Sequence, residues 1–323
     1  MASLKEEEFI DIIKNNFSVT GEKGDIFGIG DDCAVFRIKG RQVVTCDMLT
    51  EGTHFNLNII NGYDLGCKSA LVNISDVSAM GAEPRYAFVS VGFNINHSSD
   101  FLTDFYRGMI SVFDKNGVSI LGGDTVRSNS LVINITLIGE TDNPIMRNGA
   151  EPGDAIIISD YAGLSHAGLD ALLKYGSSAS QKYKSLVNAH YNPKITLEVS
   201  KELAKTGKIH SMMDLSDGIC KDLRTMCDVS GVGAEAELEY FEKNKDLIFF
   251  CEKENKNIYD YLLNNFEDYT LLMTCSYNDK DIIMDILKNY GTPSCIGRIT
   301  EKKCIRIYKN GKIYEIPSAW EHF

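Results

Sequence analysis

Seven aspartates stand beside small residues or directly after apolar runs, where carboxylates can act on a ligand. They lie in the segments GIGDD, VVTCDM, NISDVS, ILGGDT and MMDLSDG, and they are Asp31, Asp32, Asp47, Asp76, Asp124, Asp214 and Asp217. A single aspartate beside glycine or serine is usually a turn former or a helix N-cap. Several of these aspartates follow β-like runs, however, and α/β sheets place their ligands at the carboxyl ends of strands. The set as a whole therefore favours ligand binding.

Converging carboxylates repel one another unless cations neutralise them. Hard oxygen ligands without a Cys/His cluster indicate magnesium, and the nine cysteines show no CxxC pair or zinc spacing. Magnesium retains waters and bridges protein carboxylates to phosphates, which phosphoryl transfer requires. The aspartates thus predict magnesium-dependent phosphate chemistry.

Several neighbouring residues allow two interpretations each. The glycines of ILGGDT either let the backbone approach a phosphate or form a tight turn. Arg147 clamps an anion or is simply solvated, and His54 contacts a phosphate or caps a strand end. Ser216 or Asp217 is expected to cap a helix that begins at Gly218, and this is compatible with both a ligand-binding and a purely structural interpretation.

Strand and helix patterns alternate along the first part of the chain, and these elements must position the aspartates. We expect helices over Asp64–Met80 and Ser99–Asn116, and strands over Ala34–Ile38, Val43–Cys46, Tyr86–Phe93, Val118–Leu121 and Leu131–Ile138. Such alternation predicts an α/β or α+β domain.

A second domain is expected because 323 residues exceed a typical single domain. The segment GETDNPIMRNGAEPG reads as a linker, which places the domains at residues 1–143 and 144–323. The later part alternates again, with strands at DAIIIS, Ile209–Met213, YTLLMT and the tail, and helices at Ala167–Tyr175, Pro193–Lys205, Gly218–Val229 and KDIIMDILKNY. Asn310-Gly311 between two β-like runs predicts a two-residue hairpin.

Composition excludes several classes of function. A formal charge of −12 disfavours binding to nucleic acid or to an anionic membrane through the bare surface. The N-terminus lacks the features of a signal peptide, and no apolar run reaches the roughly 18 residues of a membrane span. Neither GxxxxGK[ST] nor GxGxxG occurs, and the histidines show no HExxH or GxSxG context. We expect a cytoplasmic protein with reduced cysteines.

The order of segments resembles that of bacterial thiamine-monophosphate kinases over nearly the whole chain. The matching segments are GIGDDCAV, CDMLTEGTHF, KSALVNISDVSAMGA, GGDT, MRNGAEPGD, MMDLSDGI, FEDYTLL and the terminal WEHF. The wider superfamily is similar to aminoimidazole ribonucleotide synthetase, HypE and selenophosphate synthetase. The resemblance implies an N-terminal α/β domain that binds ATP and magnesium and pairs its sheet across a homodimer. It also implies a C-terminal α/β domain that completes the ATP and substrate site.

The resemblance implies specific roles for residues of this sequence. Several magnesium ions per site would be held by Asp31, Thr45, Cys46, Asp47, Asp76, Asp124, Asp214 and Asp217. ATP would be contacted by Tyr106, Gly123, Asp124, Arg147 and Ser216, and the substrate by His54, Glu267 and Trp320. Catalysis would rest on Asp47, Asp124 and Asp217. Trp320 either stacks on the thiamine rings or packs against the body of the protein.

Two positions depart from the family pattern. Phe266 stands where the family usually has glycine, and a bulky residue at this position is expected to alter the loop that presents Glu267. Cys46 stands where the family often has threonine, and because a thiol is a poor magnesium ligand, only its carbonyl can serve. Asp32 has no implied role and is expected to hydrogen-bond locally.

The implied activity is ATP-dependent phosphorylation of thiamine monophosphate to thiamine diphosphate by direct in-line transfer. Two alternatives remain: another small-molecule kinase or synthetase of the same superfamily, and a non-catalytic nucleotide-binding module. The chain lacks the early reactive cysteine of selenophosphate synthetases and the terminal cysteine of HypE, since its first cysteine is Cys33 and its last residue is Phe323.

Overall fold

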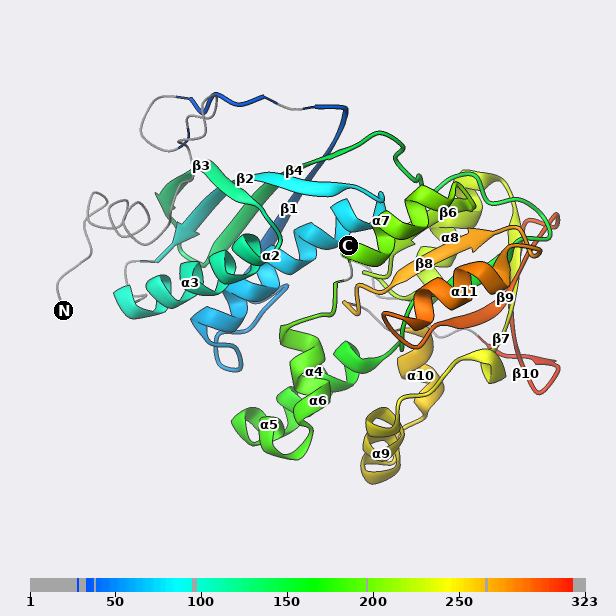
Figure 1. Ribbon diagram of the computed structural model, residues 1–323. Coiled ribbons are helices and arrows are strands. Elements are labelled where there is room, and N and C mark those ends of the chain that lie inside the picture. The colour runs from blue at the N-terminus through cyan, green and yellow to red at the C-terminus, as the bar shows by residue number, and fades with distance from the viewer. Residues whose placement is uncertain are drawn as a thin grey trace. The chain divides into compact units, whose positions relative to one another are not determined.

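The chain folds into two compact units. The computed structural model describes residues 28, 33–37, 39–94, 98–195, 197–264 and 267–315. The first unit comprises Met1–Val77 and Ala82–Asp142, and the second comprises Ser78–Gly81 and Asn143–Phe323. Each unit has its own sheet and helices (Figure 1), so the predicted mixed α/β class is confirmed.

The first unit is a four-stranded sheet with two long helices. The strands lie in the order β1 (Arg41–Thr50), β4 (Val132–Thr141), β2 (Glu83–Phe93) and β3 (Ser119–Arg127). Only β2 and β3 run parallel to each other; the other pairs are antiparallel. Helices α2 (Gly62–Ala79) and α3 (Ser99–Lys115) lie side by side on one face of this sheet (Figure 1).

Alternating burial along the strands shows which side chains face the two helices. In β4 the side chains of Ile133, Ile135 and Leu137 are buried, while the residues between them are half-exposed. The two helices approach closely at Gly66, where an added Cβ would lie 1.9 Å from the carbonyl oxygen of Phe105. Only glycine permits this contact, so the helix pair depends on it.

The predicted elements of the first unit are mostly confirmed, but the strands are longer than expected. Residues 34–37 form no strand; Val35 makes a single bridge. The prediction that the aspartates follow strand ends is wrong for Asp47 and Asp124, because both lie within strands. Asp47 and Asp124 lie on β1 and β3, which are the two edge strands of this sheet.

The second unit contains a seven-stranded mixed sheet. Its strands lie in the order β11 (Lys312–Ile313), β10 (Ile305–Lys309), β7 (Gly233–Glu237), β9 (Ser294–Thr300), β5 (Ala155–Ile158), β8 (Leu271–Cys275) and β6 (Ile209–Asp214). All four residues of β5 are buried, which fits its place near the middle of the sheet. The β10–β11 hairpin turns at Asn310 and Gly311, with φ of 50° and 69°, so the predicted hairpin is confirmed.

Helices cover this sheet and form a separate cluster beside it (Figure 1). The predicted helices correspond to α4 (Leu164–Tyr175), α7 (Leu197–Thr206), α8 (Ile219–Ser230) and α11 (Lys280–Lys288). Not predicted were β7, β9, the 3₁₀ turns Gly176–Ser178 and Leu238–Tyr240, and the helices α5 (Ala179–Lys182), α6 (Lys184–Tyr191), α9 (Lys245–Glu254) and α10 (Ile258–Leu263).

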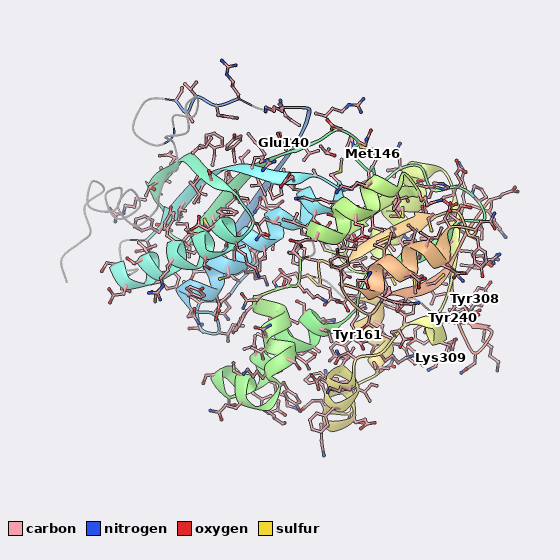
Figure 2. All side chains as sticks on the ribbon, viewed as in Figure 1. Glu140, Met146, Tyr161, Tyr240, Tyr308 and Lys309 are labelled. Carbon is pink, nitrogen blue, oxygen red and sulfur yellow. The ribbon has the colours of Figure 1, made fainter. Side chains whose placement is uncertain are left out.

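Polar contacts tie strands and helices together within each unit. Glu140 on β4 pairs with Arg85 on β2 at 2.7 Å, and Lys309 lies 4.2 Å from the centroid of the Tyr259 ring (Figure 2). All nine cysteines are free thiols, as expected. Within the described part of the chain, no helix has the length and apolar character to cross a membrane.

Candidate active site

A pair of carboxyl groups lies between β1 and α2 in the first unit. Thr45 Oγ1 donates a hydrogen bond to Asp76 Oδ2 at 2.5 Å. Burial raises the pKa of Asp47 to about 6, with further contributions from the charge of Asp76 and from hydrogen bonding between the two side chains. Two carboxyl groups this close disfavour each other's charge, and a cation between them would relieve that repulsion.

The donors at this pair suit magnesium. Two carboxylates and a hydroxyl are hard oxygen groups, and magnesium is commonly held by one or two carboxylates together with waters and substrate phosphates. Among the residues that the structure describes, no group of three or more acidic, histidine or cysteine side chains could hold a metal ion. The site therefore suits a cation that is coordinated partly by these side chains and partly by a bound ligand and water.

Cys46 directs its side chain away from this pair. Its Sγ accepts hydrogen bonds from Asn134 Nδ2 and Thr136 Oγ1, both at 3.3 Å, on the neighbouring strand β4. Asp47 follows with the opposite orientation because side chains alternate along a strand. Only the main chain of Cys46 is thus available on the side of Asp76.

Asp124 lies apart from the Asp47–Asp76 pair. Asp47 lies opposite Ile135 on β4, which lies opposite Val89 on β2, which lies opposite Gly123 on β3. These four residues form one row across the sheet, and Asp124 belongs to the next row. That row includes Met48, which is 57% exposed on the face away from α2. Three strand spacings of about 4.8 Å separate the two edge strands by roughly 14 Å.

Gly123 and Tyr106 are both closely packed near Asp124. A Cβ on Gly123 would lie 1.7 Å from the carbonyl oxygen of Val89, so this glycine is required by strand pairing, not by a tight turn. Tyr106 on α3 is buried, which raises the pKa of its hydroxyl, and it hydrogen-bonds to Thr125. Asp124 Oδ1 accepts the Thr125 N–H at 2.8 Å.

His54 closes the end of β1. Its Nδ1 accepts a hydrogen bond from the Thr50 N–H at 3.0 Å, so the strand-capping interpretation agrees with the structure. An acceptor Nδ1 leaves the ring proton on Nε2 in the neutral form. Nε2–H is a donor suited to an anionic oxygen.

A turn at the end of β6 gathers three predicted ligands in the second unit. Asp214 is buried, whereas Ser216 and Asp217 are half-exposed. Lys221, one helical turn later, forms an ion pair with Asp217 at 2.8 Å. Three oxygen-bearing side chains thus lie within one turn. The ion pair with Lys221 shows that a positively charged group can bind Asp217.

Asp222 is a residue of this turn that sequence reasoning missed. Gly218 is the N-cap of α8 and makes no side-chain cap; instead Asp222 Oδ2 accepts the N–H groups of Asp217 at 3.1 Å and Gly218 at 3.0 Å. Burial raises the pKa of Asp222 to about 7, and the charges of Asp217 and Asp214 contribute. The expectation that Ser216 or Asp217 caps this helix is wrong. The one feature of the local sequence that could have indicated this contact is an aspartate in the first turn of α8.

Glu267 is held against the same turn by main-chain hydrogen bonds. Its N–H donates to the Ser216 carbonyl, and the Tyr269 N–H donates to the Leu215 carbonyl, both at 2.9 Å. Glu267 and Tyr269 both have positive φ, 59° and 55°, which side-chain-bearing residues rarely adopt. Asp268 between them accepts the N–H groups of Gly163 and Ser165 at 2.5 and 2.9 Å. Strain of this kind persists where the surrounding structure fixes the loop.

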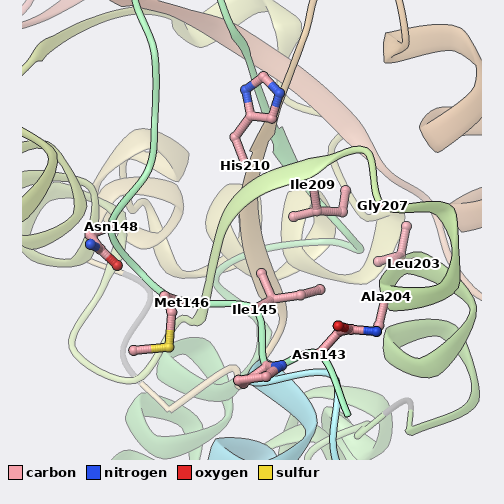
Figure 3. A pocket seen from close by; sticks show the side chains of 10 residues that line it. Asn143, Ile145, Met146, Asn148, Leu203, Ala204, Gly207, Ile209 and His210 are labelled. Atoms are coloured by element: carbon pink, nitrogen blue, oxygen red, sulfur yellow. The ribbon is translucent and has the colours of Figure 1, made fainter. Parts of the chain in front are cut away.

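Arg147 lies in an exposed loop that forms one wall of a cavity. The cavity has a volume of about 260 Å³ and lies between this loop, the end of α7 and the start of β6. Ile145, Met146 and Asn148 line it from the loop, and His210 lines it from β6 (Figure 3). His210 Nδ1 lies 2.8 Å from Asp154 Oδ2, which fixes the ring.

Some predicted site residues fall outside the described part of the chain. These are Asp31, Asp32, Phe266 and Trp320. Of the others, the structure brings together Thr45, Asp47 and Asp76 in the first unit, and Asp214, Ser216, Asp217 and Glu267 in the second.

The two-unit fold with these carboxylates defines a protein of the AIR synthase related class. Residues 30–141 match the model described as AIR synthase related protein, N-terminal domain, and residues 151–310 match that of the C-terminal domain. The thiamine-monophosphate kinase of Aquifex aeolicus is 31% identical over 296 residues, covering 91% of this chain and 92% of that protein. The chain belongs to the thiamine-monophosphate kinase family.

Solved structures agree in fold over almost the full length. The thiamine-monophosphate kinase from Stenotrophomonas maltophilia K279a has a TM-score of 0.83 at 27% identity, covering 97% of this chain and 99% of that chain. AaThiL complexed with AMPPCP and TMP has a TM-score of 0.78 at 29% identity, covering 98% of this chain and 97% of that chain.

Proposed function

We propose that this chain phosphorylates thiamine monophosphate to thiamine diphosphate, with ATP as the phosphoryl donor. Its family membership supports this activity, as does the similarity to a structure complexed with AMPPCP and TMP. The observation that carries the proposal is the close pair of Asp47 and Asp76, with the Thr45 hydroxyl 2.5 Å from Asp76 Oδ2, because converging carboxylates of this kind are suited to a divalent cation that also binds phosphates.

The cation in this proposal is magnesium, with several ions per site. Its ligands would be Asp31, Thr45, the carbonyl of Cys46, Asp47, Asp76, Asp124, Asp214 and Asp217. When bound, magnesium neutralises the charge of the two phosphate groups and so lets them approach one another. Residues 1–143 would supply most of these ligands, and residues 144–323 would complete the ATP and substrate site.

The remaining predicted residues bind and orient the two substrates. ATP would be contacted by Tyr106, Gly123, Asp124, Arg147 and Ser216, and thiamine monophosphate by His54, Glu267 and Trp320. His54 would donate its Nε2 proton to a phosphate oxygen, since its Nδ1 is already held by Thr50.

The transfer itself needs no dedicated general base. An oxygen of the substrate phosphate is already largely ionised near neutral pH, and it attacks the γ-phosphorus in line. A bond forms between this oxygen and the γ-phosphorus, the bond to the bridging β–γ oxygen breaks, and ADP leaves with that electron pair. Catalysis then consists of positioning and charge neutralisation by Asp47, Asp124 and Asp217.

We further propose that the chain acts as a homodimer through the face of the first sheet that lies away from α2 and α3. Val44 and Met48 on β1 and Val126 on β3 are 62%, 57% and 53% exposed on that face. Exposed apolar side chains gathered on one sheet face favour burial against a partner, and the resemblance indicates a second copy of this chain.

The activity is tested by incubating the purified chain with ATP, magnesium and thiamine monophosphate and measuring thiamine diphosphate by mass spectrometry. Product should form with magnesium and not with excess chelator. The Asp47→Asn variant serves as the matched control and should form little product. Absence of product from the unaltered, folded chain would reject the proposal and favour another substrate or a binding module.

A further inference from the structure

We propose that Asp222 is a positioning residue that holds the turn from Asp214 to Gly218 in its cation-binding form. The inference rests on the proposed function, because that function assigns Asp214 and Asp217 to magnesium and Ser216 to ATP. Asp222 itself is 2% exposed and lies in the first turn of α8.

The turn is fixed from two sides. On the strand side, the Leu215 N–H donates to the Thr270 carbonyl at 2.8 Å, and Ser216 accepts from Glu267. On the helix side, Asp222 Oδ2 accepts two consecutive N–H groups, those of Asp217 and Gly218. Gly218 has φ of 102° and no side chain with which to cap α8, so Asp222 performs the capping from within the helix.

The link between Asp222 and the turn is geometric. A single carboxyl oxygen, Oδ2, accepts the N–H of the assigned ligand Asp217 and the N–H of the next residue, Gly218. Asp222 is buried, so the surrounding residues hold its side chain in this position.

Asp222 would thus act on the metal through other residues. By fixing the main chain of Asp217 and Gly218 it orients the carboxylates on either side of Leu215. Partners that orient metal ligands in this way typically contribute 10–100-fold to metal affinity.

The test measures Mn²⁺ binding to the full chain by the electron paramagnetic resonance of free Mn²⁺, beside thermal unfolding. Asp222→Ala should weaken Mn²⁺ binding about 10–100-fold, and Asp222→Asn, which keeps one acceptor oxygen, should weaken it less. In the kinase assay both variants should raise the KM for ATP.

Asp160→Ala is the matched control. Asp160 Oδ1 likewise accepts two main-chain N–H groups, those of Tyr161 at 2.9 Å and Thr292 at 3.1 Å, at a turn without predicted ligands. This variant should lose thermal stability while keeping the Mn²⁺ affinity of the unaltered chain. Equal losses of Mn²⁺ affinity in Asp160→Ala and Asp222→Ala would overturn the inference, as would unchanged affinity in a folded Asp222→Ala chain. A folded, unaltered chain that binds no Mn²⁺ would instead overturn the magnesium assignment on which the inference depends.

Discussion

The main-chain N–H of Glu267 donates a hydrogen bond to the main-chain carbonyl of Ser216 at 2.9 Å. This bond joins a residue predicted to contact the substrate to one predicted to contact ATP. Glu267 has φ of 59°, a conformation that costs an ordinary residue about 1–2 kcal/mol and glycine almost nothing.

Replacing Glu267 by glycine should therefore separate stability from function. We expect Glu267→Gly to keep or raise the free energy of unfolding by up to about 1 kcal/mol, because the backbone strain is relieved. The KM for thiamine monophosphate should rise at least about tenfold, since a charged hydrogen-bonding group is worth about 1.5–3 kcal/mol. Urea unfolding and steady-state kinetics measure the two effects. Asn255→Gly, at φ of 53° beside α9, should leave the KM unchanged; an unchanged KM in Glu267→Gly would exclude the substrate contact.

The Asp47–Asp76 pair predicts how stability depends on pH without metal. A folded pKa of about 6 for Asp47, above its ordinary value of 3.8, means that its stabilising contribution is complete below pH 4 and is lost as pH rises through 6. Two pKa units correspond to about 3 kcal/mol, and solvent screening of this partly exposed group reduces the loss to about 1–2 kcal/mol.

Asp47→Asn should remove this pH dependence and lower turnover severely. The comparison is between the variant and the unaltered chain in urea unfolding at pH 4, 6 and 8 with chelator present. Parallel pH profiles for the two proteins would contradict the raised pKa of Asp47.

Local sequence patterns anticipated the hairpin at Asn310-Gly311 and the long helices, because both depend on neighbouring residues. They could not place Asp47 and Asp124 within strands, since the extent of a strand depends on its pairing with β4 or β2. The contact of Asp222 Oδ2 with the Gly218 N–H and that of the Glu267 N–H with the Ser216 carbonyl each involve a backbone group, whose partner the residue type does not reveal. The Asp47–Asp76 contact depends on how α2 packs on β1, which only the fold determines.

Asp124→Asn should lower kcat by at least about 100-fold and leave the fold intact. Its carboxylate is exposed, and its one described hydrogen bond comes from the adjacent Thr125 N–H. Removing a group that stabilises the transition state costs about 2.7–4 kcal/mol, whereas a surface substitution changes stability by less than about 0.5 kcal/mol. Single-turnover kinetics measure the loss of rate, and thermal unfolding checks that the fold is intact. A kcat within threefold of the unaltered chain would remove Asp124 from the catalytic set.

Two buried oxygens in the described residues lack hydrogen-bond partners, Asn73 Oδ1 and Thr270 Oγ1. The Asn73 side chain donates from Nδ2 to the Ser69 carbonyl at 3.0 Å, which fixes which atom remains unpaired. Asn73→Leu should raise the free energy of unfolding by about 1 kcal/mol, because an unpaired buried acceptor costs about 1–3 kcal/mol. Thr270→Val should do the same in the second unit. Urea unfolding of both variants measures this, and a loss of stability in both would show that these oxygens have partners in solution.

The proposed dimer predicts the effect of a charge on the sheet face that lies away from α2 and α3. Val44→Glu should convert the dimer to a monomer in analytical ultracentrifugation, because burying an unpaired carboxylate opposes association. Leu173→Glu changes an equally exposed apolar residue of α4, 63% exposed against 62%, and should leave the assembly unchanged. A Val44→Glu chain that sediments as the unaltered protein would place the interface elsewhere.

The raised pKa of Asp47 couples cation binding to pH. Where Asp47 is protonated, a cation that takes its oxygens would displace this proton into solution. Near pH 6, calorimetric heats of binding should then vary with the ionisation enthalpy of the buffer. The apparent affinity for the cation should fall in acid, where protons compete for the same oxygens. Protons and cations are thus alternative ligands of the Asp47–Asp76 pair.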